Sequence, residues 1–293
     1  MSTQRNQVLS VKEARNFLIN YQGLNTVCRY TQEKGVISYF EKVGCIQYDP
    51  LNVVGRNADL TLQSRVKGYH ADMLYKLLYQ KRTVIDAWDK MMALYLQKDW
   101  PYFKRLRTSK GKEIEAVLAR RNSLQALEHL DEVREHIKKH GPSQSSSIDI
   151  GICNPGKWGS KKLASAAMDY LFNIGELGIY SKNNVQRTYE FTEKLLKKEI
   201  LEESDPFQSD DEFYEWYVKR RIGSVGMLWA CNGGGWLGHF ISDSDIRNSK
   251  IKRLLEKGEI EEFYVESVKN PFYIRSEDTE YLNKKSTKKE VKF

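Results

Sequence analysis

The sequence predicts a mainly α-helical fold with small β-hairpins (α+β), built as tandem winged-helix units. Apolar residues at helical spacing over residues 160–174 are followed by two short strands, at 176–180 and 185–191. The same order returns 83 residues further on, where the run Leu254 to Ile260 (LLEKGEI) matches Leu171 to Leu177 (LFNIGEL). A helix followed by a strand pair is the arrangement of a winged helix, and its recurrence at a fixed distance indicates an internal repeat.

The amino-terminal residues predict the helices of a first winged-helix unit. Ser10 and Glu13 have the spacing of a capping box, and apolar residues follow at helical spacing until Gly23. A second helix is expected over residues 35–43, with Gly44 as its stop. Asn57 can cap a third helix that runs through Val66, although the alternation at residues 60–62 also allows a strand. Further elements are expected as a helix around 73–78, strands at 83–88 and 91–96, and a charged helical tract over about 99–139.

Interruptions in these patterns predict where the units begin and end. Gly141-Pro142 and the serine run after it break the helical tract, and an acidic stretch over residues 199–215 separates the two repeats. We therefore predict a first winged-helix unit with the helical tract over 1–140, a second over 141–200, a third over 201–282, and a lysine-rich tail over 283–293. The glycine cluster at 233–238 has no G-K-S/T after it, so it predicts a loop packed close to another backbone instead of a phosphate loop.

The segment Gln47-Tyr48-Asp49-Pro50 is the strongest candidate for chemistry. It follows the apolar pair Cys45-Ile46, and Pro50 disfavours a helical conformation for Asp49. In an extended backbone Gln47 and Asp49 share one face, about 7 Å apart, while Tyr48 points to the other. An amide and a carboxylate beside a buried strand need a partner or a purpose. The alternative is that Asp49 only opens a turn before the proline.

Composition narrows the class of protein. The 293 residues carry 47 basic and 39 acidic side chains, a net charge of +8 that is unevenly placed, so one positive face and a polyanionic partner such as nucleic acid are expected. The four cysteines include no C-x-x-C pair, which predicts neither a disulfide framework nor structural zinc. The chain has no long apolar run and no apolar leader, so no membrane span or secretion signal is expected. A reducing, cytoplasmic location is therefore predicted. His136 and His140 lie one helical turn apart in a charged context that favours a solvated helix face over a metal site.

Several ordered segments together resemble the AlkZ/YcaQ family of winged-helix DNA glycosylases, over roughly residues 10–282. They are SVKEARNFLINYQGL at 10–24, GCIQYDPLNVVGRN at 44–57, an L-x-S-R at 62–65, IDAW at 85–88, a G-P-S at 141–143, WGSKKLASAAMDYLFNIGEL at 158–177 and RTYEFTE at 187–193. In that family a catalytic Q-Φ-Q or Q-Φ-D motif lies in the strand, and Gln47-Tyr48-Asp49 has the Q-Φ-D form of the YcaQ-like branch. Two features depart from the family. Its further carboxy-terminal β segment is absent here, and many relatives have a histidine where this chain has Lys90.

The resemblance implies a monofunctional DNA glycosylase that hydrolyses the N-glycosidic bond of N7-alkylated guanine and unhooks interstrand crosslinks. Asp49 would activate water and stabilise the oxocarbenium ion, and Gln47 would position the water or the sugar. Neither a cofactor nor a metal is required. The expected partner is double-stranded DNA, bound by a monomer in the nucleoid-containing cytoplasm. The expected phosphate ligands are Arg56, Arg65, Lys157, Lys161, Lys162 and Arg187, each of which could instead be a solvated surface charge.

A different function remains open on the sequence alone. Winged helices serve DNA binding far more often than catalysis, so a non-catalytic DNA-binding protein, such as a transcriptional regulator, is the alternative. A carboxylate beside Gln47 on a DNA-facing side argues against that alternative, because a pure binder gains nothing from negative charge near phosphates. An RNA-binding or scaffold protein is supported only by the net charge.

Overall fold

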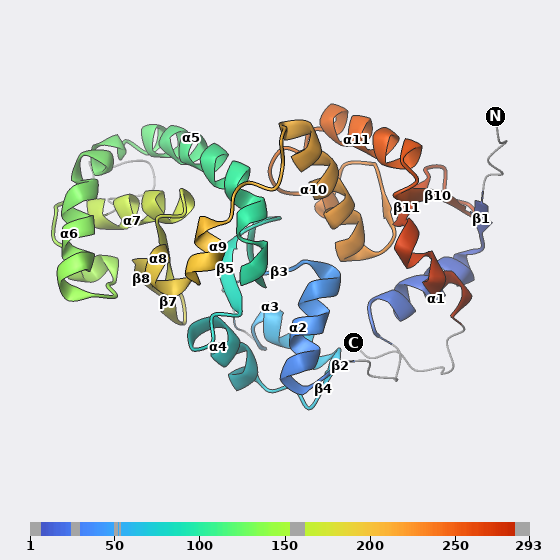
Figure 1. Cartoon of the computed structure of the whole chain (residues 1–293), viewed down its shortest axis with the longest axis horizontal. Helices are drawn as coiled ribbons and strands as arrows, with labels where there is room; N and C mark the ends of the chain where they lie inside the picture. Colours follow the sequence, from blue (N-terminus) through green and yellow to red (C-terminus); the bar gives the residue numbers. More distant parts are fainter. Residues whose placement is uncertain (1–6, 25–29, 50–51, 53, 153–161, 285–293) are drawn as a thin grey trace. The chain divides into compact units, whose positions relative to one another are not determined.

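The structure is a computed structural model that describes residues 7–24, 30–49, 52, 54–152 and 162–284 (Figure 1). The chain forms two compact units made of interleaved segments. Compact unit 1 combines residues 1–74, 89–96 and 207–293, and compact unit 2 combines residues 75–88 and 97–206. The finer division into three winged-helix units and a tail stays a prediction. Within the described residues, no helix is both long and apolar enough to span a membrane.

The amino-terminal half of compact unit 1 contains three helices with short strands between them (Figure 1). The capping box is confirmed at α1 (Val11–Tyr21), where Ser10 Oγ accepts from Glu13 N at 3.2 Å and the Glu13 carboxylate accepts from Ser10 N at 2.8 Å. Helix α2 (Gln32–Val43) ends at Gly44 as predicted, because Gly44 has φ +77° and its N–H donates to Phe40 O at 2.8 Å. Strand β2 (Tyr30–Thr31) pairs in parallel with β4 (Val66–Lys67), and β3 (Cys45–Gln47) pairs antiparallel with β6 (Met92–Leu96).

The prediction for the third helix was wrong in two respects. Helix α3 spans Asn57–Gln63 with Arg56 at its N-cap, so Asn57 is the first helical residue and not the cap. The Asn57 side-chain amide instead donates to Gln47 O at 2.8 Å. The helix also stops before Val66, which is drawn into β4 by pairing with Tyr30. Both differences come from partners that are distant in the sequence.

The carboxy-terminal half of compact unit 1 is a winged helix. Helix α10 (Asp210–Val225), capped by Ser209, packs against α11 (Ser244–Glu256), and α11 leads into β10 (Ile260–Val265) and β11 (Phe272–Arg275). Short elements complete this half: β1 (Gln7–Leu9), β9 (Leu228–Trp229), and the 3-10 helices η5 (Gly234–Trp236) and η6 (Ser276–Asn283). The sheet has the order β1-β10-β11-β9, so the first strand of the chain is parallel to a strand near its end.

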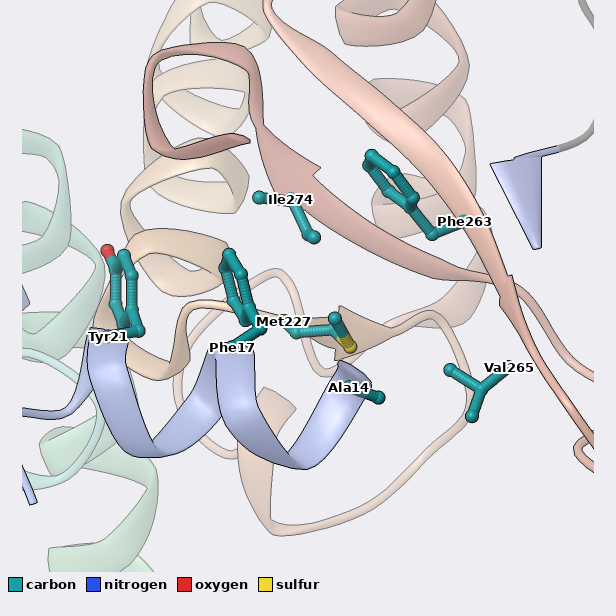
Figure 2. Close-up of a cluster of buried hydrophobic side chains, with 7 residues drawn as sticks. All are labelled: Ala14, Phe17, Tyr21, Met227, Phe263, Val265 and Ile274. Carbon is teal, nitrogen blue, oxygen red and sulfur yellow. The ribbon is translucent and has the colours of Figure 1, made fainter. Parts of the chain in front are cut away.

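A buried apolar cluster joins the two ends of the sequence. Figure 2 shows Ala14, Phe17 and Tyr21 projecting from one face of α1 toward Met227 and Ile274. Phe263 and Val265 of β10 complete the cluster, and all seven residues are less than one-tenth exposed. Spacing of three and four residues places the α1 side chains on one stripe, which is why this helix is amphipathic. Burying each large side chain contributes about 1.5–3 kcal/mol, so α1 is held by tertiary packing more than by its own propensity.

Compact unit 2 is a helical core with one long hairpin (Figure 1). Helix α7 (Leu163–Asn173), with eight buried residues, packs against α5 (Lys104–Arg120) and α6 (Leu130–His140). It leads into β7 (Leu177–Asn183) and β8 (Gln186–Phe191), the second helix-and-strand-pair arrangement. The other elements are α4 (Ala71–Tyr79), which enters from compact unit 1, β5 (Val84–Trp88), η1 (Gln97–Asp99), η2 (Pro101–Phe103), η3 (Leu124–His129), η4 (Ser145–Ser147), α8 (Thr192–Leu195) and α9 (Lys198–Glu202).

Two predictions for this unit need correction. The charged tract is not one helix, because it breaks after α5 at Asn122, which has φ +52° and is followed by η3. The strands predicted at 176–180 and 185–191 leave residues 181–184 for the turn, but β7 continues to Asn183 and the turn is Asn184-Val185. Asn184 has φ +53°, a conformation that asparagine tolerates better than most residues, and this fixes the turn there.

The predicted repeat is visible in matching hydrogen bonds. At the end of α7, Glu176 N donates to Leu171 O at 2.9 Å, and 83 residues later Glu259 N donates to Leu254 O at the same distance. The glycines before these donors, Gly175 and Gly258, have φ +84° and +67°. Each helix therefore ends in the same left-handed glycine turn and enters its strand pair in the same way. Tandem winged-helix units are confirmed as the fold.

Candidate active site

Gln47 and Asp49 lie at the exposed end of β3. The Tyr48 N–H donates to Met92 O at 2.8 Å, so pairing with β6 continues one residue beyond the strand. Gln47 and Asp49 are exposed, whereas Ile46 is buried and Tyr48 is half-buried. This alternation is that of an extended backbone, in which every second side chain lies on the same face. An amide and a carboxylate are therefore offered to solvent side by side, which is the arrangement the sequence predicts.

The start of β3 is fixed by helix α10. Arg220 Nη2 donates to Gly44 O at 2.9 Å, directly before the strand. A Cβ at Gly44 would lie 3.0 Å from Arg220 Cζ, and Gly44 also has a positive φ. Only glycine satisfies both conditions without displacing the arginine. Gly44 thus both ends α2 and leaves room for the Arg220 guanidinium, which orients β3.

A buried carboxylate lies beneath the same strand. Asp89 is 1% exposed, and its two oxygens lie 3.2 Å from Arg220 Nε and 3.1 Å from Arg221 Nη2. Tyr217 OH donates to Asp89 O at 2.8 Å. Burial acts to raise the pKa of Asp89, but the two guanidinium groups outweigh burial and hold it below its usual range. Asp89 is therefore ionised and anchors α10 to the residues that precede β6.

Cys45 is part of this buried cluster and not a nucleophile. Burial raises the pKa of its thiol to about 12, and the neighbouring Asp89 carboxylate acts in the same direction. The thiol consequently stays protonated at neutral pH and serves as a hydrogen-bond donor to Asp89. The first residue of the strand thus supports the site without supplying chemistry.

Lys90 lies at the same end of the β3–β6 ladder as Asp49. It is the middle residue of the turn Asp89–Met91, which is closed by Asp89 N donating to Met91 O at 3.1 Å. The glycine cluster covers its backbone, since a Cβ at Gly238 would lie 2.7 Å from Lys90 O. This close approach confirms the prediction of a loop packed against another backbone. Partial burial first, and the charge of Arg221 second, hold the pKa of Lys90 below its usual range.

The arginines expected to bind phosphate in compact unit 1 make contacts within the unit. Arg56 Nε lies 2.6 Å from Asp59 Oδ2, and Arg56 is half-buried. Arg65 donates to Thr61 O at 3.1 Å, and its guanidinium lies over the Tyr39 ring, 5.7 Å from the centroid. These contacts orient both side chains. They support a structural role for Arg65 in particular.

The four expected ligands on the second winged-helix unit are placed differently. Lys157 and Lys161 lie outside the described residues. Lys162, at the N-cap of α7, is exposed. Arg187 is half-buried over the Phe172 ring, with its Nη1 3.7 Å from Asp169 Oδ1. Of the two described, Lys162 is thus the side chain offered to solvent.

The described residues contain no group of three or more His, Cys, Asp or Glu arranged to hold a metal ion. The rings of His136 and His140 are in contact on α6, with centroids 4.6 Å apart and planes tilted by 39°. Partial burial, and after it the neighbouring His140, lower the pKa of His136 from its usual value.

Sequence reasoning missed the buried cluster of Asp89, Arg220 and Arg221. Each is an ordinary charged residue in its local context, and the partners are more than 130 positions apart. One signal was available. Asp89 directly follows the IDAW segment that carried part of the family resemblance, and a carboxylate next to a buried strand requires a cation.

Comparisons with known proteins identify both a family and a similar solved structure. A family model described as "DNA glycosylase AlkZ-like" matches residues 40–293. The solved structure of Streptomyces sahachiroi DNA glycosylase AlkZ is similar in fold, with a TM-score of 0.60 and 13% sequence identity. That match covers 94% of this chain and 72% of the AlkZ chain. The family model spans most of the sequence, including β3 and the buried cluster beneath it, and the chain therefore belongs to the AlkZ-like DNA glycosylase family.

Proposed function

We propose that this protein excises N7-alkylated guanine from double-stranded DNA, with Asp49 as the catalytic carboxylate and Gln47 as its positioning partner. The observation that carries the proposal is the pair of exposed polar side chains at the end of β3, in a chain of a DNA glycosylase family. Family membership favours this function over that of a non-catalytic DNA-binding regulator. Membership itself supports a glycosylase, and the substrate and residue roles are our proposal.

Departure of the base requires little assistance from the protein. Alkylation at N7 makes guanine cationic, so the base can depart without being protonated and needs no strong general acid. This agrees with the residues at the exposed end of β3, which offer an amide and a carboxylate. A base that leaves easily can be excised by a site with few catalytic groups.

The deoxyribose requires more assistance from the protein than the base does. As the glycosidic bond breaks, positive charge develops on the deoxyribose, as in glycoside hydrolysis. The Asp49 carboxylate would stabilise this oxocarbenium character and accept a proton from the attacking water. The Gln47 amide can hold that water or a sugar oxygen, because both side chains emerge from the same face of the strand. Attack by water leaves an abasic site in an intact strand, which is the outcome of a monofunctional glycosylase.

The buried cluster supports these roles by limiting motion. Arg220 fixes the residue before β3, and Asp89 fixes the residues before β6, so both strands of the ladder are tied to α10. A catalytic carboxylate is useful only if it is held within a fraction of an ångström of its working position. Anchored backbone on both sides of the Gln47–Asp49 segment meets this requirement.

We further propose that the enzyme acts on crosslinked guanine through groove contacts. A base joined to the opposite strand cannot easily rotate out of the helix, so a deep flipping pocket would not accept it. An exposed strand end fits such a substrate better than a buried cavity. Lys162, together with Lys157, Lys161, Arg56 and Arg187, would contact backbone phosphates, and Arg65 would act mainly by supporting its own unit.

The direct test is incubation of the purified chain with a duplex that contains 7-methylguanine, followed by chromatography of the freed base. We expect release of 7-methylguanine and, in parallel, alkali-labile abasic sites at the lesion. A matched duplex with unmodified guanine should release nothing. If no base is released while the protein gives a defined footprint on undamaged DNA, the regulator interpretation would replace this one.

A further inference from the structure

A cleft of about 460 Å³ lies within compact unit 2, where α5 faces the end of α7 and the segment of α9. All of its lining residues belong to this unit, so the cleft is formed by one compact unit alone. None of them is among the six phosphate ligands expected from the sequence. A volume of this size is in the range of protein sites that bind a nucleotide-sized group.

The wall of the cleft formed by α5 is positively charged. Residues 104–112 contain five basic and no acidic side chains, and three of the five, Lys104, Arg107 and Lys112, line the cleft. Lys104, Thr108 and Lys112 are spaced four residues apart, so they form one stripe about 12 Å long on the helix. Both lysines are exposed, and within the described residues neither side chain takes part in an ion pair. The stripe therefore offers two ammonium groups that no carboxylate of the described chain neutralises.

Arg107 adds a third cation that is held in a fixed position. Its Nη1 donates to Trp100 O at 2.7 Å, and its guanidinium lies over the Trp100 ring, 3.8 Å from the centroid. A Cβ at Gly175 would collide with Arg107 Cδ, so the glycine turn after α7 makes room for the arginine. A guanidinium ordered in this way adds positive charge to the cleft without a further cost in side-chain entropy.

The wall that faces α5 is partly apolar. Ile200 and Leu201 of α9 line it, and both are half-buried. The chain just after α9 is held to α5 by an ion pair, in which Arg105 Nε lies 2.9 Å from Asp205 Oδ2. The cleft is thus bordered by cations on one side and aliphatic side chains on the other.

Two carboxylates also line the cleft, Glu115 and Glu203, against three cations. Glu115 accepts a hydrogen bond from Tyr170 OH at 3.1 Å. It is eleven residues along α5 from Lys104, which corresponds to about 16 Å of helix, so it does not neutralise the first half of the stripe.

We propose that this cleft binds the sugar–phosphate backbone of double-stranded DNA. Along a DNA strand anionic phosphates alternate with apolar deoxyribose rings, and the cleft offers a partner for each. Lys104, Thr108 and Lys112 would contact phosphates of one strand, and Ile200 and Leu201 would contact the deoxyribose between them. The inference goes beyond the proposed function, because it assigns a DNA-binding surface to α5 that does not depend on which base is released.

The test is a titration of labelled, undamaged duplex with the full chain at several salt concentrations. Lys104→Ala/Lys112→Ala removes both ammonium groups of the stripe. Thr108→Glu keeps both lysines and places a carboxylate between them at an exposed position. The matched control is Lys138→Ala/Lys139→Ala, which removes two exposed lysines of α6 in the same compact unit.

We expect Lys104→Ala/Lys112→Ala to bind the duplex at least about 10-fold more weakly than the wild type. The slope of log affinity against log salt should become shallower by about 1.8, since each lost phosphate contact contributes about 0.9. Thr108→Glu should also weaken binding and flatten the slope, whereas the control variant should keep the wild-type slope. A wild-type slope in the Lys104→Ala/Lys112→Ala variant would overturn the inference, and so would an equal loss in the control.

A free nucleotide is the other source of the same ligand chemistry, and calorimetric titration with deoxyguanosine monophosphate distinguishes it. Nucleotide binding that is lost in Lys104→Ala/Lys112→Ala, with duplex binding unchanged, would overturn the assignment to DNA. No nucleotide binding, together with the weakened duplex binding, would support it. Because the duplex carries no lesion, these results are independent of base release from 7-methylguanine, and failure of either proposal can be told from failure of the other.

Discussion

Two aspartates flank the β3–β6 ladder, and their surroundings give them different roles. Asp49 is exposed at the strand end, whereas Asp89 is almost fully buried between Arg220 and Arg221. A carboxylate that is already paired with two guanidinium groups cannot approach a substrate. Burial thus separates a structural carboxylate from the one we propose for catalysis, although the sequence distance between them is only 40 residues.

Replacing Asp89 by asparagine should destabilise the fold strongly. The change leaves the Arg221 guanidinium buried without its counter-charge, which typically costs about 3–5 kcal/mol. Denaturant unfolding at pH 7 would measure the loss.

The same substitution has a pH signature. The folded pKa of Asp89 is lowered, so its contribution to stability is complete above the unfolded value of about 3.9 and is lost as the pH falls through the folded value. The difference in unfolding free energy between wild type and Asp89→Asn should therefore shrink as the pH falls from about 5 toward about 3. An unchanged difference over that range would show that the pKa of Asp89 is the same in the folded and unfolded states, and would contradict the stabilising role of the two arginines.

At the scale of elements, glycines decide where helices stop and strands begin. Gly44 and Gly258 each end a helix before a strand, with φ +77° and +67°, but they differ in their surroundings. A Cβ at Gly44 would meet Arg220, and a Cβ at Gly258 would meet nothing within 4 Å. The two positions therefore separate backbone strain from the cost of moving the arginine.

We expect Gly44→Ala to be the more damaging of the two alanine substitutions. Gly258→Ala should lose about 1–2 kcal/mol through backbone strain alone. Gly44→Ala should lose at least about 1 kcal/mol more and should also slow base release, because Arg220 no longer seats β3. Unfolding free energies and single-turnover rates of both variants would test this. Equal effects on stability, with equal rates, would mean that the contact between Gly44 and Arg220 does not orient the strand.

Local signals in the sequence predicted the elements well. The capping box at Ser10 and the glycine stop at Gly44 act within a few residues, so they can be read from the sequence alone. Alternation likewise predicted that Gln47 and Asp49 share one face, and the structure shows both side chains exposed. Each of these features depends only on neighbours along the chain.

Distant partners could not be predicted in the same way. Val66 leaves the helical pattern because it pairs with Tyr30, and β1 joins a strand whose residues are 256 positions away. The buried cluster around Asp89 depends on arginines 131 and 132 positions away. Burial and pairing of this kind come from tertiary structure, and a single sequence carries no direct record of them.

At the scale of the whole molecule, the proposed chemistry belongs to one compact unit. Residues 1–74, 89–96 and 207–293 together hold β3, the turn with Lys90 and helix α10. The strand end, its anchoring arginines and the buried Asp89 are thus assembled from three separated stretches of sequence. The catalytic proposal therefore depends on the folding of compact unit 1 as a whole, and not on any one of its three stretches.

The most direct test of this account is base release by Asp49→Asn. Asparagine keeps the size of the side chain but cannot accept the proton or stabilise the developing positive charge. We predict a loss of at least about 100-fold in the single-turnover rate of 7-methylguanine release. Duplex affinity should remain nearly unchanged, as measured by titration of labelled DNA. Release of 7-methylguanine by Asp49→Asn at the wild-type rate would contradict the account, because it would show that the Asp49 carboxylate is not needed for catalysis.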